Sequence, residues 1–273
     1  MLTEMRKYPV RHPLLREYIK FFWEIHSEYM QLNHKLIPVR NIDLKFNLSE
    51  TPHYIRLNGE DLLLNEVYFS GLHDHFRSAH LKLNGKVDML GICFYPEGFF
   101  PFLKIPASEF KNQILGAAEV GFYLANTINE QLKGAPDVSS RLNILEKELL
   151  NLLDDDHQTP LSFRQLFHAL KQSNNTQPIA EFCKQNNVGA RKLERMFNKY
   201  VGISAKTYGT LHRFQNCINQ LFNRNYSKFS DIAYENGYFD QMHFIKEFKR
   251  FAGHTPKDFI HHSNSMLQVA KVS

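Results

Sequence analysis

The chain has 273 residues, of which 43% are hydrophobic and 22% are charged, and its formal net charge is +5. This length predicts about two domains, and the apolar runs are too short for a membrane-spanning helix. Residues 1–9 lack the apolar stretch of a secretory signal, and Cys93, Cys183 and Cys217 are too isolated to form a disulfide framework or a zinc motif. We therefore expect a cytoplasmic protein that does not contact a membrane.

The first part of the chain, residues 1–155, predicts a β-rich domain with flanking helices. The predicted strands share apolar or alternating residues and run over 44–48, 62–69, 79–83 and 87–95. Asn58-Gly59 and Asn84-Gly85 separate these segments, as the turns of antiparallel hairpins do. We expect a β barrel or roll of cupin-like architecture, whose interior suits a small-molecule effector.

Helical periodicity predicts helices before and after these strands, over 14–22, 108–115, 121–132 and 139–153. The last of them carries a leucine stripe, Leu142, Leu145 and Leu149, near heptad spacing. The stripe could pair with a second copy to form a homodimer, but a helix packed on its own barrel is favoured by about two to one. An acidic run at 154–156 follows, and residues 156–161 are the predicted linker.

Three histidines, His73, His75 and His80, are the candidate metal ligands of this part. A His-X-His pair on a strand would place both rings on one face, as a metal site requires. No further ligand follows at a suitable interval, so we expect loop or strand-surface histidines instead of a metal site, and no cofactor. The competing hypothesis is a metal-dependent, cupin-like enzyme in residues 1–155 with a nucleic-acid-binding appendage. Phosphate-loop and nucleophile-elbow patterns are missing, and we expect no enzyme.

Residues 162–265 predict an all-α domain in which one pattern occurs twice, about 50 residues apart. Each copy has a short helix, a tight turn and a basic second helix. From Cys183 to Phe197 is 14 positions, from Ala233 to Phe248 is 15, and a glycine closes each copy five residues later. This spacing predicts two helix-turn-helix units, so double-stranded DNA is the expected partner. The units occupy about 178–202 and 229–256.

A single longer helix over 204–222 is predicted between the two units. It would hold them at a fixed separation, and a separation near one duplex turn, about 34 Å, would bring both second helices into successive major grooves. In the second unit Ser230 and Asp240 are the predicted N-caps of its two helices, with Asn236-Gly237 as the turn.

The second helix of each unit has an outward face of basic and amide side chains, which is the chemistry that reads base edges in the major groove. The candidate DNA-contacting residues are Arg191, Lys192, Glu194, Arg195 and Lys199 in the first unit and Gln241, Met242, His243, Lys246 and Lys249 in the second. The charge distribution agrees, because residues 161–273 carry a net +9 and residues 1–160 a net −4. A cationic surface binds phosphates by releasing counterions, so affinity should fall as salt rises.

A known family shares these features. The residues that carry the likeness are Arg191-Lys192-Leu193-Glu194-Arg195-Met196-Phe197, Gly202, Arg213, Leu221, Ile232-Ala233, Gly237-Tyr238, Phe244, Phe248-Lys249-Arg250, Gly253 and Thr255-Pro256. Through them residues 175–262 resemble the DNA-binding domain of the AraC/XylS family of bacterial transcription regulators. The resemblance implies a regulator, more an activator than a repressor, with RNA polymerase as a partner. Less specifically, the first half resembles the β-rich sensory domains of that family.

The chain departs from the family pattern at three positions. Gly189 or Ala190 stands where a small hydroxyl residue commonly opens the first recognition helix of the family. Cys217 replaces a usual alanine, and Ile260 stands where a basic residue often follows the Thr-Pro pair. The first departure weakens a phosphate contact that the resemblance implies for the first unit.

Overall fold

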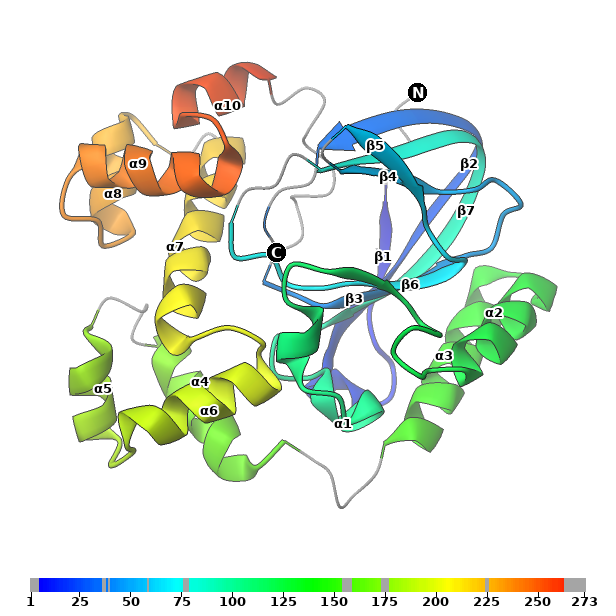
Figure 1. The fold of residues 1–273 in the computed structure, drawn as a ribbon, viewed down its shortest axis with the longest axis horizontal. Coiled ribbons are helices and arrows are strands. Elements are labelled where there is room, and N and C mark those ends of the chain that lie inside the picture. Colours follow the sequence, from blue (N-terminus) through cyan, green and yellow to red (C-terminus); the bar gives the residue numbers. More distant parts are fainter. Residues whose placement is uncertain are drawn as a thin grey trace.

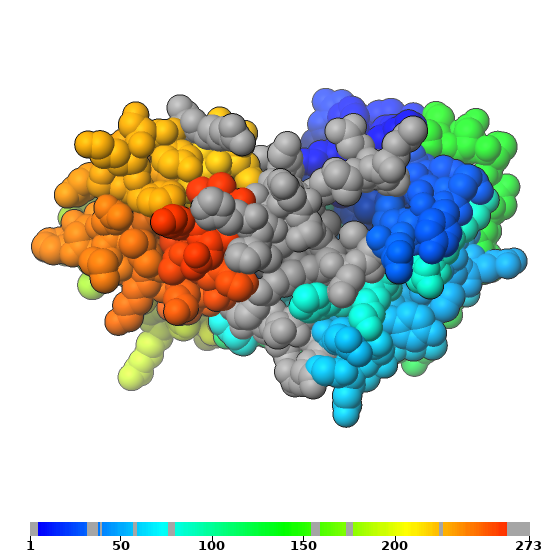
Figure 2. Space-filling model, turned by 90° about the horizontal axis from the view of Figure 1, so that it is seen from above, coloured from blue at the N-terminus to red at the C-terminus, as the bar shows by residue number. Residues whose placement is uncertain are grey.

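The computed structural model describes residues 5–35, 38, 40–57, 59–75, 79–153, 159–172, 177–223 and 226–262. A β-rich N-terminal part lies beside a helical C-terminal part (Figure 1). Seen from above, the two parts form two lobes (Figure 2). The predicted α+β fold class is confirmed. The acidic run at 154–156 and the first half of the segment predicted as a linker lie outside the described residues.

One antiparallel sheet of eight strands forms the N-terminal part. Its strands are β1 (Arg6–Tyr8), β2 (Ile19–Lys35), β3 (Asp43–Asn47), β4 (Tyr54–Leu57), β5 (Glu60–Leu63), β6 (Val67–Ser70), β7 (Ala79–Phe94) and β8 (Ile114–Gly116). Their order is β1-β2-β7-β3-β6-β8, with β4 paired to β7 and β5 to β4. The order of the described strands has two ends, so the sheet is an open roll and not the closed barrel that was one of the two expectations.

The prediction of a turn at Asn84-Gly85 was wrong. The two segments predicted there as separate strands form the single 16-residue strand β7. Gly85 has a φ of 137° and pairs with Met30, at a shift in register between Ser27 and Met30 of β2. Glycine therefore allows a bulge here, which bends a continuous strand instead of ending it.

Two predicted helices of the N-terminal part are also absent from the described structure. Residues 14–22 form a short 3-10 turn, η1 (Leu15–Glu17), followed by the start of β2. Residues 108–115 form a second 3-10 turn, η2 (Ala107–Phe110), followed by the start of β8. Both faces of β2 are covered at Phe21, Phe22 and Trp23, so its residues are apolar without alternation, and this pattern cannot be told from that of a buried helix.

Helices α1 (Phe100–Leu103), α2 (Leu124–Gly134) and α3 (Val138–Leu152) accompany the sheet (Figure 1). The predictions over 121–132 and 139–153 are confirmed as α2 and α3, with small shifts at their ends. The leucine stripe of α3 is buried in the same core as Leu44 and Phe46 of β3. Arg141 of α3 also donates to both carboxylate oxygens of Asp88 on β7, at 2.9 Å each. The stripe therefore packs on its own sheet, which was the favoured alternative.

Seven helices form the described C-terminal part: α4 (Leu161–Gln172), α5 (Ile179–Gln185), α6 (Ala190–Tyr200), α7 (Ala205–Phe222), α8 (Phe229–Glu235), α9 (Gln241–Ala252) and α10 (Pro256–His262). They enclose a core rich in aromatic rings, including Phe163, Phe197, Phe214 and Phe248. Ser204 caps α7 by accepting the N–H of Thr207 at 3.0 Å. No helix in the described ranges is long and apolar enough to cross a membrane.

The two parts of the molecule meet at the C-terminal end of α6. Phe100 of α1 packs edge-on against Tyr200, with ring centres 5.1 Å apart. Gly202 follows α6 with a φ of 89°, and a Cβ added there would lie 2.6 Å from the carbonyl oxygen of Ala107. The backbones of the two parts are thus in close contact at a position that glycine alone fits without strain.

Candidate nucleic-acid interface

Helices α5 and α6 form the first helix-turn-helix unit. Asn187 in the turn between them has a φ of 52°. Gly189 is the N-cap of α6 and gives no side-chain cap. Because Leu193 and Phe197 are buried on one side of α6, the intervening residues Glu194 and Arg195 face solvent.

Helices α8 and α9 repeat the arrangement. Gly237 occupies the turn with a φ of 72°, and Asp240 caps α9 by accepting the N–H of His243 at 2.7 Å, as predicted. The prediction that Ser230 caps α8 was wrong, because the N-cap is Lys228. The Lys228 N–H donates to the Asp231 carboxylate at 2.9 Å, so an acidic residue in the first turn satisfies this helix end.

All ten predicted DNA-contacting side chains are exposed. On α6 and α9 they form one face each, opposite the buried aromatic residues. The two helices lie at opposite ends of α7, on the half of the molecule away from the sheet (Figure 1). Helix α7 has 18 residues, and a helix of that length is about 27 Å long. Helix α7 therefore separates the exposed basic faces of α6 and α9.

Lys199 differs from the other nine residues. Its ammonium nitrogen lies 4.6 Å from the centre of the Phe100 ring and 5.3 Å from that of Tyr200. Lys199 is therefore engaged where α6 meets the β-rich part, although it remains exposed.

A shallow hollow of about 580 Å³ lies on the exposed surface of α6, lined by Ala190, Arg191, Glu194, Arg195 and Asn198. Asn198 lines this hollow but is not among the predicted contact residues. Near α9, Phe239 is 86% exposed and Met242 is 73% exposed. Phe239 directly follows the buried Tyr238. Two adjacent aromatic residues cannot both face the core here, so this pair in the sequence could have indicated an exposed aromatic side chain beside α9.

A polar contact beneath α9 connects it to α7. Arg213 of α7 lies 3.4 Å from the Glu247 carboxylate and 5.3 Å from the Tyr238 ring centre. Burial raises the pKa of Tyr238 and raises the pKa of Cys217 on α7 to about 12, so both groups are neutral in this contact.

Of the three candidate metal ligands, His73 and His75 lie in the loop over 71–75, whereas His80 lies on β7. His75 Nδ1 lies 2.7 Å from the Asp74 carboxylate, which also accepts from Lys111 at 2.8 Å. Burial would raise the pKa of Asp74, but hydrogen bonds from Lys111, His75 and Asn112 lower it to about 2. Within the described ranges, no group of three or more His, Cys, Asp or Glu residues could hold a metal ion.

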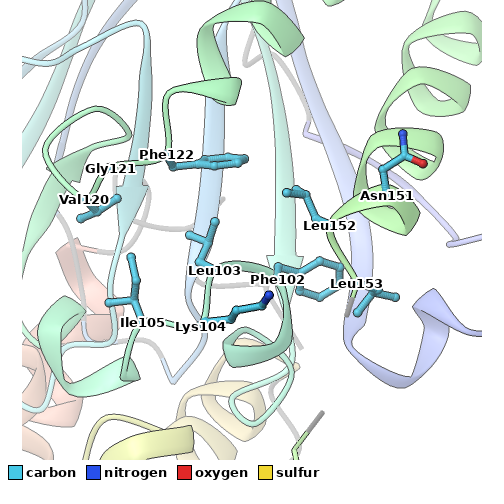
Figure 3. Close-up of a pocket in the computed structure, with 10 residues that line it drawn as sticks. All are labelled: Phe102, Leu103, Lys104, Ile105, Val120, Gly121, Phe122, Asn151, Leu152 and Leu153. Carbon is cyan, nitrogen blue, oxygen red and sulfur yellow. The ribbon is translucent and has the colours of Figure 1, made fainter. Parts of the chain in front are cut away.

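A pocket of about 650 Å³ opens on the N-terminal part between α1, the segment before α2 and the end of α3 (Figure 3). It is lined by Phe102, Leu103, Lys104, Ile105, Val120, Gly121, Phe122, Asn151, Leu152 and Leu153. Most of these side chains are apolar, and Lys104 is the charged one among them.

Comparison with known proteins agrees with the two-part structure. Residues 182–262 match a family described as a helix-turn-helix domain, and residues 11–116 match a family described as a domain of unknown function (DUF6597). The HTH-type transcriptional activator RhaR of Yersinia pestis is 32% identical over 114 residues, which are 41% of this chain and 37% of that protein. RhaR of Yersinia pseudotuberculosis matches equally. The chain thus spans little more than a third of the length of these curated relatives.

A solved structure of ToxT from Vibrio cholerae aligns over 94% of this chain and 98% of its own, with 9% sequence identity and a TM-score of 0.46. The duplicated helix-turn-helix geometry and the match over residues 182–262 agree on the nature of the helical part. That part is a helix-turn-helix domain of the AraC/XylS type.

Proposed function

We propose that the protein is a sequence-specific DNA-binding transcription regulator, an activator without enzymatic activity, that works in the cytoplasm. The observation that carries the proposal is the pair of exposed basic faces, α6 and α9, at the two ends of α7. Each face would enter a major groove, and the spacing would bring the two helices to successive grooves on one side of the duplex.

The individual roles follow from side-chain chemistry. Arg191 and Arg195 can pair with guanine or with phosphates, and Gln241 can pair with adenine. Lys246 and Lys249 supply charge toward the phosphate backbone. Phe239 and Met242 are apolar and exposed beside the start of α9, so they suit contact with thymine methyl groups.

The β-rich part would sense a small-molecule effector and pass the signal through the contact between Phe100 and Tyr200. RNA polymerase is the expected protein partner of an activator. The leucine stripe of α3 is buried, so a homodimer would need another surface.

A gel-shift titration with fragments of the region upstream of the protein's own gene tests the proposal. We expect a specific complex whose affinity falls linearly with the logarithm of the salt concentration, with a slope of about −0.9 for each neutralised phosphate. Absence of a specific complex at every salt concentration, or a slope near zero, would contradict it. A variant with Arg195→Ala and Lys246→Ala is the control, and it should keep its fold and lose affinity.

A further inference from the structure

The sheet of the β-rich part has two faces, and α3 covers one of them. The other face is enclosed between the two halves of the sheet. Strands β2 and β7 bend at the register shift near Gly85, and their distal halves, with β4 and β5, curve back over the sheet (Figure 1). Trp23 and Met89 from the near halves share an apolar cluster with Leu83 from the distal half of β7.

This face carries polar side chains in its interior. Strand pairing aligns Trp23, Gly91, Lys45 and Tyr68 in one row, because Trp23 pairs with Gly91, Gly91 with Lys45, and Lys45 with Tyr68. Residues opposite one another in an antiparallel sheet project to the same side. The neighbouring row aligns Cys93 with Asp43.

Several buried polar atoms on this face have no hydrogen-bond partner within the described part of the chain. They are both ring nitrogens of His53, the hydroxyl of Tyr68 and Oδ1 of Asp43. His53 and Tyr68 are each only 1% exposed, and their rings meet edge-on with centres 6.4 Å apart. A buried polar group without a partner is costly, and water or a ligand usually satisfies it.

The charges on this face do not balance. Lys45 lies 5.6 Å from the Tyr68 ring centre and Lys20 lies 5.8 Å from that of Phe21, and neither ammonium has a hydrogen bond or ion pair among the described residues. Asp43 is the carboxylate beside them, and burial raises its pKa while it lowers the pKa of both lysines. Two ammonium groups thus share one carboxylate, which leaves a place for another anion.

We propose that this face is the effector site and that it binds a small organic carboxylate, with the anionic group near Lys45, Lys20 and Tyr68 and the apolar part against Trp23 and Met89. The amphipathic lining of the face decides the class of ligand, since an ammonium pairs with the charge and the apolar cluster accepts the remainder. The indole of Trp23 lies so close to Gly91 that a Cβ there would be 2.1 Å from its ring, so the ring is fixed in place.

The test uses the full chain and its single tryptophan, Trp23, as a fluorescent reporter. Benzoate and hexanoate are the probes, and benzamide and hexanamide are their neutral counterparts. We expect both carboxylates to change the fluorescence saturably with a Kd of about 1 mM or below, and the amides to bind at least about tenfold more weakly. No saturable change with either carboxylate up to about 10 mM, or an equal response to the amides, would overturn the proposal.

Two variants locate the binding. Lys45→Met should raise the Kd for benzoate at least about tenfold. Tyr68→Phe keeps the ring and removes the hydroxyl, and it should raise the Kd for benzoate about fivefold. This second variant tests the site if Lys45→Met does not fold. Lys147→Met, at an exposed position on α3, is the matched control and should bind like the unmodified protein. A wild-type Kd in whichever of the two site variants fold would overturn the assignment.

The inference rests on the proposed sensory role of the β-rich part. The fluorescence titration needs no DNA, so a failed gel shift leaves this site standing. Conversely, a failed titration removes the site without affecting the case for DNA binding.

Discussion

The ammonium nitrogen of Lys199 lies 4.6 Å from the centre of the Phe100 ring, so the last turn of α6 rests on the β-rich part. Phe100 is 6% exposed and packs within the core of the helical part. Phe100→Ala should therefore lower the free energy of unfolding by about 3 to 5 kcal/mol, measured by urea denaturation. Phe100→Leu should cost clearly less. Equal stability of the alanine variant would show that this contact does not hold the two parts together.

Gly202→Ala should destabilise the protein because the residue has a φ of 89° and its new Cβ would lie 2.6 Å from the Ala107 carbonyl oxygen. The left-handed conformation alone costs a non-glycine residue about 1 to 2 kcal/mol. Gly189→Ala is the matched control, since nothing lies within 4 Å of its Cβ position. Thermal unfolding should show a lower Tm for the first variant and little change for the second. A similar Tm in both variants would contradict the close backbone contact.

Asp240→Ala removes the cap of α9 and should cost about 1 kcal/mol of stability. It should also weaken DNA binding, because the uncapped first turn carries Gln241, Met242 and His243. Asp137 caps α3 in the same manner, accepting the Ser140 N–H at 2.7 Å. Asp137→Ala should give a comparable loss of stability with unchanged affinity in a gel shift. An equal loss of affinity in both variants would mean that general destabilisation, and not the α9 cap, is responsible.

Arg195→Ala and Lys246→Ala should each weaken DNA binding, by about 1 to 3 kcal/mol where the side chain reads a base. Where a side chain contacts a phosphate, the loss should be uniform across sequences and the salt slope should decrease by about one unit. Titrations at several salt concentrations separate the two roles. Wild-type affinity in either variant would remove that residue from the interface.

Burial, assisted by the charge of Lys45, lowers the pKa of His53 from an ordinary 6.5 to about 4. Between these values the unfolded chain binds more protons than the folded one, so stability is fully present above pH 6.5 and falls as the pH drops toward 4. The loss from this residue should reach about 3 kcal/mol. Urea denaturation of His53→Gln between these two pH values should show a free energy of unfolding that changes less steeply with pH than in the unmodified protein. His168→Gln, at an exposed position, should retain the original slope.

The helical part was predictable because its signals are local. Asn187 and Gly237 mark the turns, and buried aromatics at fixed spacing define each second helix, so the sequence alone specifies these elements. The β-rich part was less predictable because its bends depend on pairing between distant strands. Gly85 is a bulge only because Met30 lies opposite it.

The site residues divide in the same way. The exposed faces of α6 and α9 follow from helical periodicity, and all ten candidate DNA-contacting residues named from the sequence are exposed. Lys45, Tyr68 and His53 could not be identified as a group, because they come from three different segments. Pairing of β3 with β6 brings Lys45 beside Tyr68, and the ring of His53 meets that of Tyr68 from the segment before β4. Alternation along β3 shows that Asp43 and Lys45 share a face, but it does not show what that face encloses.

The uninterrupted course of α7 sets the rotational phase between the two helix-turn-helix units. Each residue of an α-helix adds about 1.5 Å of length and about 100° of rotation. A single inserted residue would thus barely lengthen the spacer but would turn α9 about a quarter of the way around the axis. Substitutions at exposed positions of α7 therefore leave the relative orientation of α6 and α9 unchanged, whereas an insertion or deletion within α7 would alter it.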